Sequence, residues 1–338
     1  MTLRWGIVSA GKITNDFANA FNTFPDVGDQ VLAAIAARDW SRAKEFATLH
    51  KIPKVFDSYE DMAKSNSLDI AYIGALNPDH YNLSKLFLEN GKHVLCEKPL
   101  WLNLKQTQSL VNIAKQKKRF LMEAVWSRFS PIYLALEKAV QAGEFGEVKH
   151  VDVTFGTPIA MIEKNRKKEL GGSSILTIGI YALQFAQFIF KDEPVKVTAV
   201  GNLNELGVDV TETVVLEYQG GRRAALNVDS TVKLWNKATV VGTKGRITLE
   251  DPFHFPEVMI RVDGTVEKIP LHTSNIPFKF MNSAGLVYQT LEVAKCIRKG
   301  LFESPRMPHK ESLVLAKLED TVRRQIGVHF DADDEKYP

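Results

Sequence analysis

The chain has 338 residues, too many for one compact core and suited to two domains of ordinary size. Hydrophobic residues make up 45% and charged residues 25% of it, as in globular proteins, which excludes a disordered chain, a collagen-like repeat and a coiled coil. Its 43 Lys and Arg residues against 40 Asp and Glu residues give a net charge of +3. So small an excess gives no general argument for nucleic acid or anionic lipid as a partner.

The two cysteines, Cys96 and Cys296, are too few for a disulfide framework or a zinc site. We therefore expect reduced thiols in a cytoplasmic protein that needs no metal. The longest apolar stretch, residues 175–190, contains Thr177, Gln184 and Gln187 and is shorter than the roughly 20 residues that a bilayer requires. We therefore expect no membrane contact.

Residues 1–124 alternate short apolar runs with helical patterns. The expected strands are residues 6–8, 31–37, 70–73, 93–96 and 120–124. The expected helices are residues 13–24, a helix capped by Ser41, a helix after a capping box at Ser58, a helix ending at Asn90-Gly91, and residues 103–117. This alternation predicts an α/β fold with a doubly wound parallel sheet of the Rossmann type in an N-terminal domain.

Beyond residue 124 most strands follow one another directly. The expected strands are residues 148–155, 195–201, 213–218, 223–229, 238–241, 246–249, 258–262 and 266–269. The expected helices lie near 133–142, after Gly171-Gly172, and near 283–299 and 311–326. The pattern predicts a C-terminal α+β domain, residues 125–338, with a large, mostly antiparallel open sheet. Because such sheets often bury an open face in a partner, we expect a homodimer.

A glycine turn lies between the first expected strand and helix. Such a turn aims the helix N-terminal amides at a phosphate, and Gly11 lets the backbone approach closely. Only part of the dinucleotide fingerprint G-x-G-x-x-G is present, because Ser9 and Thr14 replace its first and last glycines. The rival interpretation, a P-loop from Gly6 to Lys12, needs Ser or Thr next, where Ile13 has no oxygen for magnesium.

Two arginines follow the second expected strand. Arg38 ends that strand and Arg42 lies one turn into the next helix, so both guanidinium groups could hold the 2′-phosphate of NADP. An NAD site usually has an acidic residue about 20 residues beyond the glycine turn, to bind the ribose 2′-hydroxyl. Asp39 adjoins Arg38, so NAD stays open as an alternative.

A lysine follows directly on the expected strand 93–96, within Glu97-Lys98-Pro99. A lysine near the carboxyl edge of a sheet is costly to bury unless it is paired or functional. Lys98 is therefore a candidate for chemistry in the cleft above the sheet.

Five motifs occur in the order seen in the Gfo/Idh/MocA oxidoreductases, the glucose–fructose oxidoreductase family. They are Gly6–Ile13, residues 36–43, Asn77–His80, Cys96–Pro99 and Gly171–Tyr181. The chain resembles this family from residue 1 to about residue 328. Within it, residues 121–129 and 300–305 make the chain most similar to the dimeric dihydrodiol dehydrogenases, which use NADP.

The resemblance implies a role for each matching residue. The pyrophosphate would lie on Ser9, Gly11, Lys12 and Ile13, and the 2′-phosphate on Arg38 and Arg42. The cofactor cleft would be lined by Tyr72, Asn77, His80 and Glu97. Lys98 would lie beside the nicotinamide and the reacting hydroxyl, with Tyr181 as its polar partner. An apolar wall for a ring-shaped substrate would come from Trp126, Phe155 and Phe280.

One position departs from the family pattern. Thr177 stands where the family has a catalytic aspartate, one helical turn before Tyr181 and on the same side of the helix. A threonine hydroxyl can hydrogen-bond or relay a proton but cannot act as a general base. We therefore expect Lys98 to accept the proton, because burial and the positive nicotinamide disfavour its charged form and nothing obvious opposes that shift. Tyr181 or His80 could instead receive or relay it.

The resemblance implies hydride transfer from a small-molecule alcohol to NADP. The substrate would be a trans-dihydrodiol, which gives a catechol, or a cyclic pentose such as D-xylose, which gives a lactone. The alternative, motivated by Thr177, is an NADPH-binding sensor or interaction protein with weakened catalysis.

Overall fold

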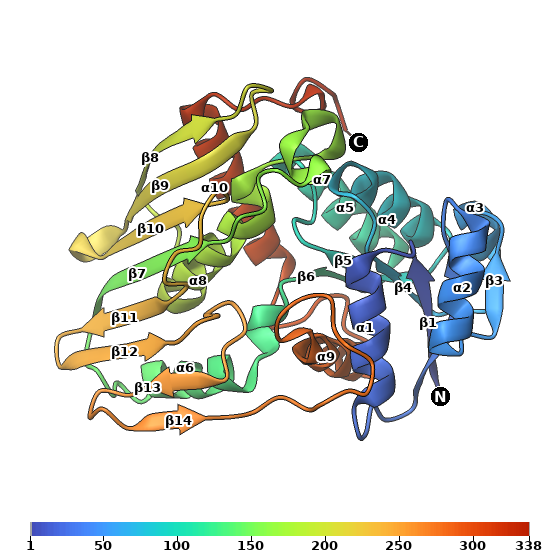
Figure 1. The fold of residues 1–338 in the computed structure, drawn as a ribbon, viewed down its shortest axis with the longest axis horizontal. Coiled ribbons are helices and arrows are strands. Elements are labelled where there is room, and N and C mark those ends of the chain that lie inside the picture. Colours follow the sequence, from blue (N-terminus) through green and yellow to red (C-terminus); the bar gives the residue numbers. More distant parts are fainter. Residues whose placement is uncertain (1, 338) are drawn as a thin grey trace.

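Two β-sheets organise the chain, shown in Figure 1 in a computed structural model that describes residues 2–337. The first sheet has the strand order β3-β2-β1-β4-β5-β6, and all its pairings are parallel. Its strands are β1 (Leu3–Val8), β2 (Gln30–Ala36), β3 (Lys54–Phe56), β4 (Ile70–Ile73), β5 (His93–Glu97) and β6 (Leu121–Ala124). The doubly wound parallel sheet is thus confirmed.

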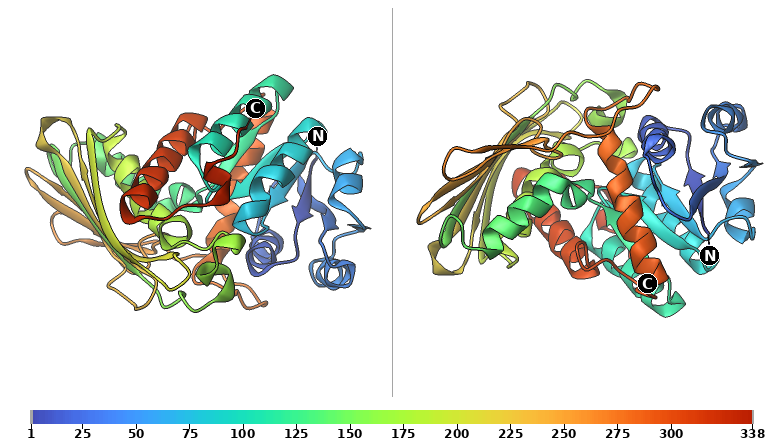
Figure 2. Two further views of the ribbon diagram at one scale, coloured as in Figure 1. Left: turned by 90° about the horizontal axis from the view of Figure 1, so that it is seen from above. Right: turned by 90° about the horizontal axis from the view of Figure 1, so that it is seen from below.

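The helices that connect these strands lie on both faces of the sheet (Figure 2). They are α1 (Lys12–Thr23), α2 (Trp40–His50), α3 (Tyr59–Lys64), α4 (His80–Glu89) and α5 (Leu104–Lys117). Two details differ from expectation. The three-residue strand β3 was not predicted, and α2 is capped by Asp39 rather than Ser41, because the Asp39 carboxylate accepts from the Arg42 amide at 3.2 Å.

The second sheet has the strand order β14-β13-β12-β11-β7-β10-β9-β8. Its strands are β7 (Val148–Gly156), β8 (Lys196–Leu203), β9 (Asp209–Glu217), β10 (Arg223–Asp229), β11 (Ala238–Gly242), β12 (Gly245–Leu249), β13 (Val258–Ile260) and β14 (Val266–Lys268). Only β7 and β10 run parallel; the other pairings are antiparallel. The expected mostly antiparallel sheet is confirmed.

Helices cover only one face of this second sheet, and Figure 2 shows the other face open. The helices beyond residue 124 are α6 (Pro131–Gln141), α7 (Glu163–Arg166), α8 (Ile180–Phe190), α9 (Leu286–Arg298) and α10 (His309–Ile326). The helical stretch Lys168–Phe190 is long and apolar enough to cross a bilayer, but nearly all of its most apolar window is buried inside the protein. It is a core element of the fold.

The last two helices return to the first sheet. Helix α9 packs against α1, and α10 packs against both α5 and β8, so each reaches residues far away in the sequence. One hydrophobic core extends through both parts, from Trp5 on β1 to Phe253 after β12. The predicted boundary at residue 124 coincides with the end of β6, and the cleft that carries the candidate site lies where the two sheets meet.

Candidate active site

The glycine turn lies at the point where the first sheet reverses its strand order, between β1 and β4. Ser9 has a φ of 87°, and Gly11 is the N-terminal cap of α1. The first-turn amides of Lys12 and Ile13 have no carbonyl partner within the helix, so they can donate to a ligand. Gly74, at the end of β4, faces them, and a Cβ there would lie 2.4 Å from Thr14 Cγ2. The close approach of the two loops therefore requires glycine at 74.

Of the two arginines, Arg42 contacts this turn directly, whereas Arg38 is exposed beside Asp79. Arg42 Nη2 donates to the carbonyl of Ala10 at 3.0 Å. The Arg38 side chain is 73% exposed, and its nearest acid, Asp79, is 3.9 Å away. Asp39 is engaged as the cap of α2. Helix amides, two guanidinium groups and Lys12 form a donor set that suits the phosphates of a dinucleotide.

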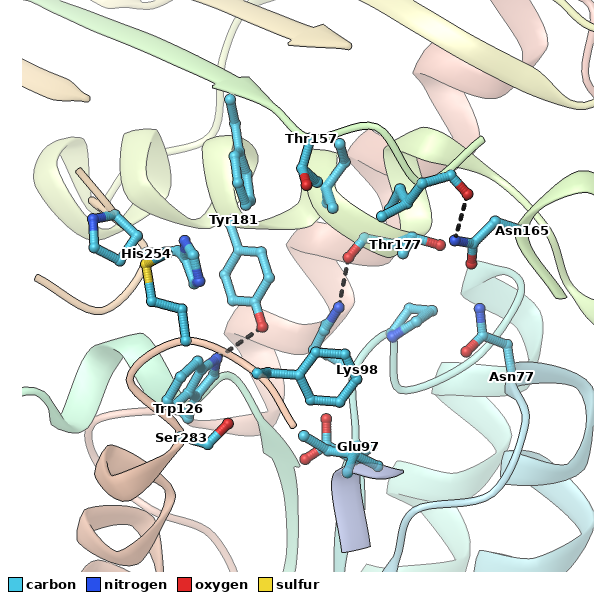
Figure 3. A pocket seen from close by; sticks show the side chains of 18 of the residues that line it. Asn77, Glu97, Lys98, Trp126, Thr157, Asn165, Thr177, Tyr181, His254 and Ser283 are labelled. Atoms are coloured by element: carbon cyan, nitrogen blue, oxygen red, sulfur yellow. Dashed lines mark hydrogen bonds between the residues drawn. The ribbon is translucent and has the colours of Figure 1, made fainter. Parts of the chain in front are cut away.

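Lys98 follows β5 and points into the cleft (Figure 3). Its Nζ donates to the backbone carbonyl of Thr177 at 2.5 Å and lies 4.7 Å from the centre of the Tyr181 ring. Burial lowers the pKa of this amine from 10.5 to about 8, although the neighbouring Glu97 acts in the opposite direction. Lys98 is therefore a base that is partly neutral near physiological pH. The expectation that nothing opposes this shift was wrong, because Glu97 does.

Glu97 is held below the cleft by Tyr72. The Tyr72 hydroxyl donates to Glu97 Oε1 at 2.6 Å, and its ring stacks on Phe17. Burial raises the pKa of the Glu97 carboxyl, which weakens its pull on the Lys98 proton. The prediction that Tyr72 lines the cofactor cleft is wrong, because the side chain is wholly buried; it positions Glu97 instead.

Tyr181 comes from the second part of the chain, at the start of α8. Its hydroxyl oxygen accepts from Trp126 Nε1 at 2.7 Å (Figure 3). Burial raises the pKa of the Tyr181 phenol well above its usual value. The phenol therefore keeps its proton, and because Trp126 occupies a lone pair, that proton is free to be donated to a ligand.

Thr177 acts through its main chain. It lies in a π-helical turn, Ile175–Gly179, that leads into α8, and its carbonyl receives Lys98. Asp209 holds the start of this turn by accepting from the Ser173 hydroxyl at 2.9 Å and the Ile175 amide at 2.8 Å. As expected, residues 177 and 181 both line the same cavity. The group of Thr177 that contacts Lys98 is thus the backbone carbonyl. Every residue has such a carbonyl, so the identity of residue 177 could not indicate this contact.

His80 is not placed to move a proton, contrary to our expectation. It is buried, with Nδ1 2.9 Å from the carbonyl of Pro99 and Nε2 3.2 Å from that of Ala75. Burial lowers its pKa, so the ring is neutral and donates to one of these carbonyls, while its other nitrogen lies against the second without a hydrogen bond. Asn77 likewise bridges the cleft, because its Nδ2 donates to the carbonyl of Gly171 at 3.0 Å.

One cavity of about 420 Å³ is lined by Asn77, His80, Glu97, Lys98, Thr177 and Tyr181. The three aromatic residues expected for an apolar wall, Trp126, Phe155 and Phe280, all line it. Further residues line the cavity that no sequence pattern indicated, among them Thr157, Asn165, Lys164 and His254. His254 carried no motif signal, since it is brought to the cavity by packing: its ring stacks on Phe155 with centres 4.8 Å apart.

Comparisons with known proteins agree with this geometry. Residues 3–125 match the family described as an oxidoreductase family with an NAD-binding Rossmann fold, and residues 133–248 match the GFO/IDH/MocA C-terminal domain. The trans-1,2-dihydrobenzene-1,2-diol dehydrogenase of Xenopus laevis is 41% identical over 331 residues, covering 98% of this chain and 100% of that protein. The human protein of the same name is 41% identical over 334 residues, covering 98% and 99%.

A solved structure shows the same fold. The 3-ketoreductase KijD10 from Actinomadura kijaniata, in complex with NADP and TDP-benzene, superposes with a TM-score of 0.82 at 22% identity, covering 96% of this chain and 98% of that one. The matches extend over both sheets and over nearly the whole chain. This chain therefore belongs to the Gfo/Idh/MocA family and is an oxidoreductase whose Rossmann domain is of the nicotinamide-dinucleotide-binding type.

Proposed function

We propose that the protein oxidises a secondary alcohol on a small ring and uses NADP as the acceptor. The substrate is a trans-dihydrodiol, which gives a catechol, or a cyclic pentose such as D-xylose, which gives a lactone. The observation that carries this proposal is Lys98, an amine with a pKa of about 8 at the base of an aromatic-walled cavity. The names of the curated relatives support the dihydrodiol as substrate.

Lys98 and Tyr181 divide the proton chemistry between them. Neutral Lys98 donates one N–H to the carbonyl of Thr177, which leaves its lone pair free to accept the proton of the substrate hydroxyl. Tyr181, which keeps its own proton, donates to the same oxygen as negative charge develops there. A bound oxidised nicotinamide supplies the hydride acceptor. Trp126 and Phe155 shield the reacting carbon from water.

The first prediction concerns pH. Because only neutral Lys98 accepts a proton, kcat/KM for oxidation should rise with pH and level off above an inflection near 8. Below it, each pH unit should lower kcat/KM about tenfold. Initial rates on trans-1,2-dihydrobenzene-1,2-diol and D-xylose between pH 6 and 10 measure this.

Lys98→Met should abolish turnover while NADP binding stays measurable, because the base is lost and the glycine turn is untouched. Lys167→Met is the matched control. Lys167 is exposed and pairs with Glu163 on α7, so its replacement should leave kcat/KM and its dependence on pH unchanged. Near-native activity of Lys98→Met would overturn the mechanism. If the wild-type protein binds NADP but turns over no cyclic diol or pentose, the sensor alternative gains.

The preference for NADP rests on Arg38. A charge-assisted hydrogen bond contributes roughly 1.5–3 kcal/mol, so Arg38→Ala should weaken NADP binding about tenfold or more. NAD binding should change little, because NAD lacks the 2′-phosphate. Titration calorimetry with both dinucleotides measures this, with Lys44→Ala, on the helix α2 that follows Arg38, as the control. Equal losses for both cofactors would show that Arg38 only supports the fold.

A carboxylate at position 177 should hinder this enzyme at neutral pH. Thr177 lines the cavity, and its carbonyl already contacts Lys98, so Thr177→Asp places a negative charge near the amine and raises its pKa. The inflection in kcat/KM should move above 8, with a lower rate at pH 7. Thr177→Asn, similar in shape but neutral, should keep the wild-type inflection. Higher activity of Thr177→Asp at pH 7 would mean that a carboxylate base does better than Lys98 alone.

We also propose that the open face of the second sheet joins two copies of the chain. Buried Ala199, Val214 and Leu216 face the helices, so their alternating neighbours point outward. Val200 is 65% exposed opposite Thr213 in the middle of this face, and the charged pair Lys196–Glu217 lies at its end.

Light scattering should therefore give the mass of two chains for the wild-type protein. Val200→Glu should shift the mass toward one chain, because it places a carboxylate from each copy in a dry interface. Leu49→Glu, at an exposed apolar position on α2, should not change the mass. A wild-type mass of one chain at micromolar concentration would refute the homodimer.

A further inference from the structure

The strongest unused polar group of the cavity is His254. It lies on the loop between β12 and β13, and its ring is stacked on Phe155 and 4.9 Å from the ring of Tyr181. Figure 3 shows the imidazole beside the phenol of Tyr181 in the cavity. His254 is thus next to the groups that hold the reacting oxygen without being one of them.

The hydrogen-bonding capacity of this ring is not satisfied by the protein. Nδ1 is buried, and no group among residues 2–337 donates to it or accepts from it. Burial and nearby Lys98 lower the pKa of His254 to about 3, so the ring is neutral and has one donating and one accepting nitrogen. A buried polar atom without a partner is destabilising, and a phenyl ring at this place would avoid that cost.

The loop holds His254 in place from several sides. The Ser127 hydroxyl donates to the His254 carbonyl. The amide of Phe253 donates to the carbonyl of Asn236 at 3.0 Å, and Asn282 Nδ2 donates to the carbonyl of Phe255 at 2.8 Å. The loop is therefore fixed in the cavity wall. Because Nδ1 is buried, Nε2 is the nitrogen of this cavity-lining ring that a ligand can reach.

We propose that His254 binds the second, non-reacting hydroxyl of the substrate and thereby selects vicinal diols over single alcohols. This inference rests on the proposed function. Lys98 and Tyr181 engage the reacting oxygen, and a hydroxyl on the adjacent ring carbon lies one carbon further along the cavity wall, where His254 adjoins Tyr181. A neutral imidazole suits a neutral hydroxyl, to which it can donate or from which it can accept. A charged substituent would find no counter-charge on this ring.

The kinetic test compares two ring alcohols, trans-1,2-dihydrobenzene-1,2-diol and 2-cyclohexen-1-ol, which has one hydroxyl. His254→Phe should raise KM for the diol about tenfold, the loss expected for one hydrogen bond, and leave kcat nearly unchanged. For 2-cyclohexen-1-ol, both KM and kcat of this variant should stay within about twofold of the wild-type values. His254→Gln, which keeps a donor and an acceptor, should recover part of the lost affinity. His329→Phe, at an exposed position near the C-terminus, should change KM and kcat for neither substrate.

A binding test keeps the inference separate from the proposed function. With NADP bound, the wild-type protein should bind catechol more tightly than phenol, and His254→Phe should remove most of that difference. Unchanged selectivity in this variant, or an equal rise in KM for both alcohols, would show that His254 only packs against Phe155. If no ring alcohol is oxidised, the proposed function fails, while the catechol-to-phenol ratio still decides the role of His254.

Discussion

The contact between Lys98 Nζ and the Thr177 carbonyl joins the two parts of the molecule at the candidate active site. Lys98 directly follows β5 of the parallel sheet, whereas Thr177 belongs to the π-helical turn before α8, so the contact forms only when both parts are folded and docked. A carbonyl orients the amine without a full counter-charge. Burial can therefore lower the pKa of Lys98 toward 8, whereas a carboxylate would hold the amine protonated.

The same environment acts in opposite directions on two neighbouring groups. Burial lowers the pKa of the Lys98 amine and raises that of the Tyr181 phenol, because it disfavours the charged form of each. The result is a base and a hydrogen-bond donor side by side at neutral pH, the usual way in which one site separates acid and base roles. Trp126 completes the pair, since its indole N–H occupies the phenol oxygen and leaves the phenol hydrogen for the ligand.

Local sequence patterns predicted those features that depend on short-range rules. Buried parallel strands, the glycine turn and the arginines after β2 were found because strand and turn chemistry repeat within a few residues. Local patterns did not predict features that depend on contacts between residues far apart in the sequence. Tyr72 carries a polar hydroxyl, but its partner Glu97 is 25 residues away, so the sequence could not show that this hydroxyl is buried. From the sequence, His80 is a candidate for proton transfer. In the structure both of its ring nitrogens lie against backbone carbonyls, and the sequence does not indicate these contacts. His254 has no motif at all.

Position 177 shows that comparing side chains with a family pattern can miss a role of the backbone. The sequence draws attention to a missing carboxylate, but in the structure the group at 177 that holds the lysine is a peptide carbonyl, present whatever the side chain. Its place depends on the π-helical turn, and that turn is held by Asp209 on β9 through the Ser173 hydroxyl and the Ile175 amide. The orientation of the base is therefore set partly from the second sheet. A chain built in this way can carry an uncharged side chain at 177 and still hold its lysine in the cavity, with the pKa of the amine lowered to about 8.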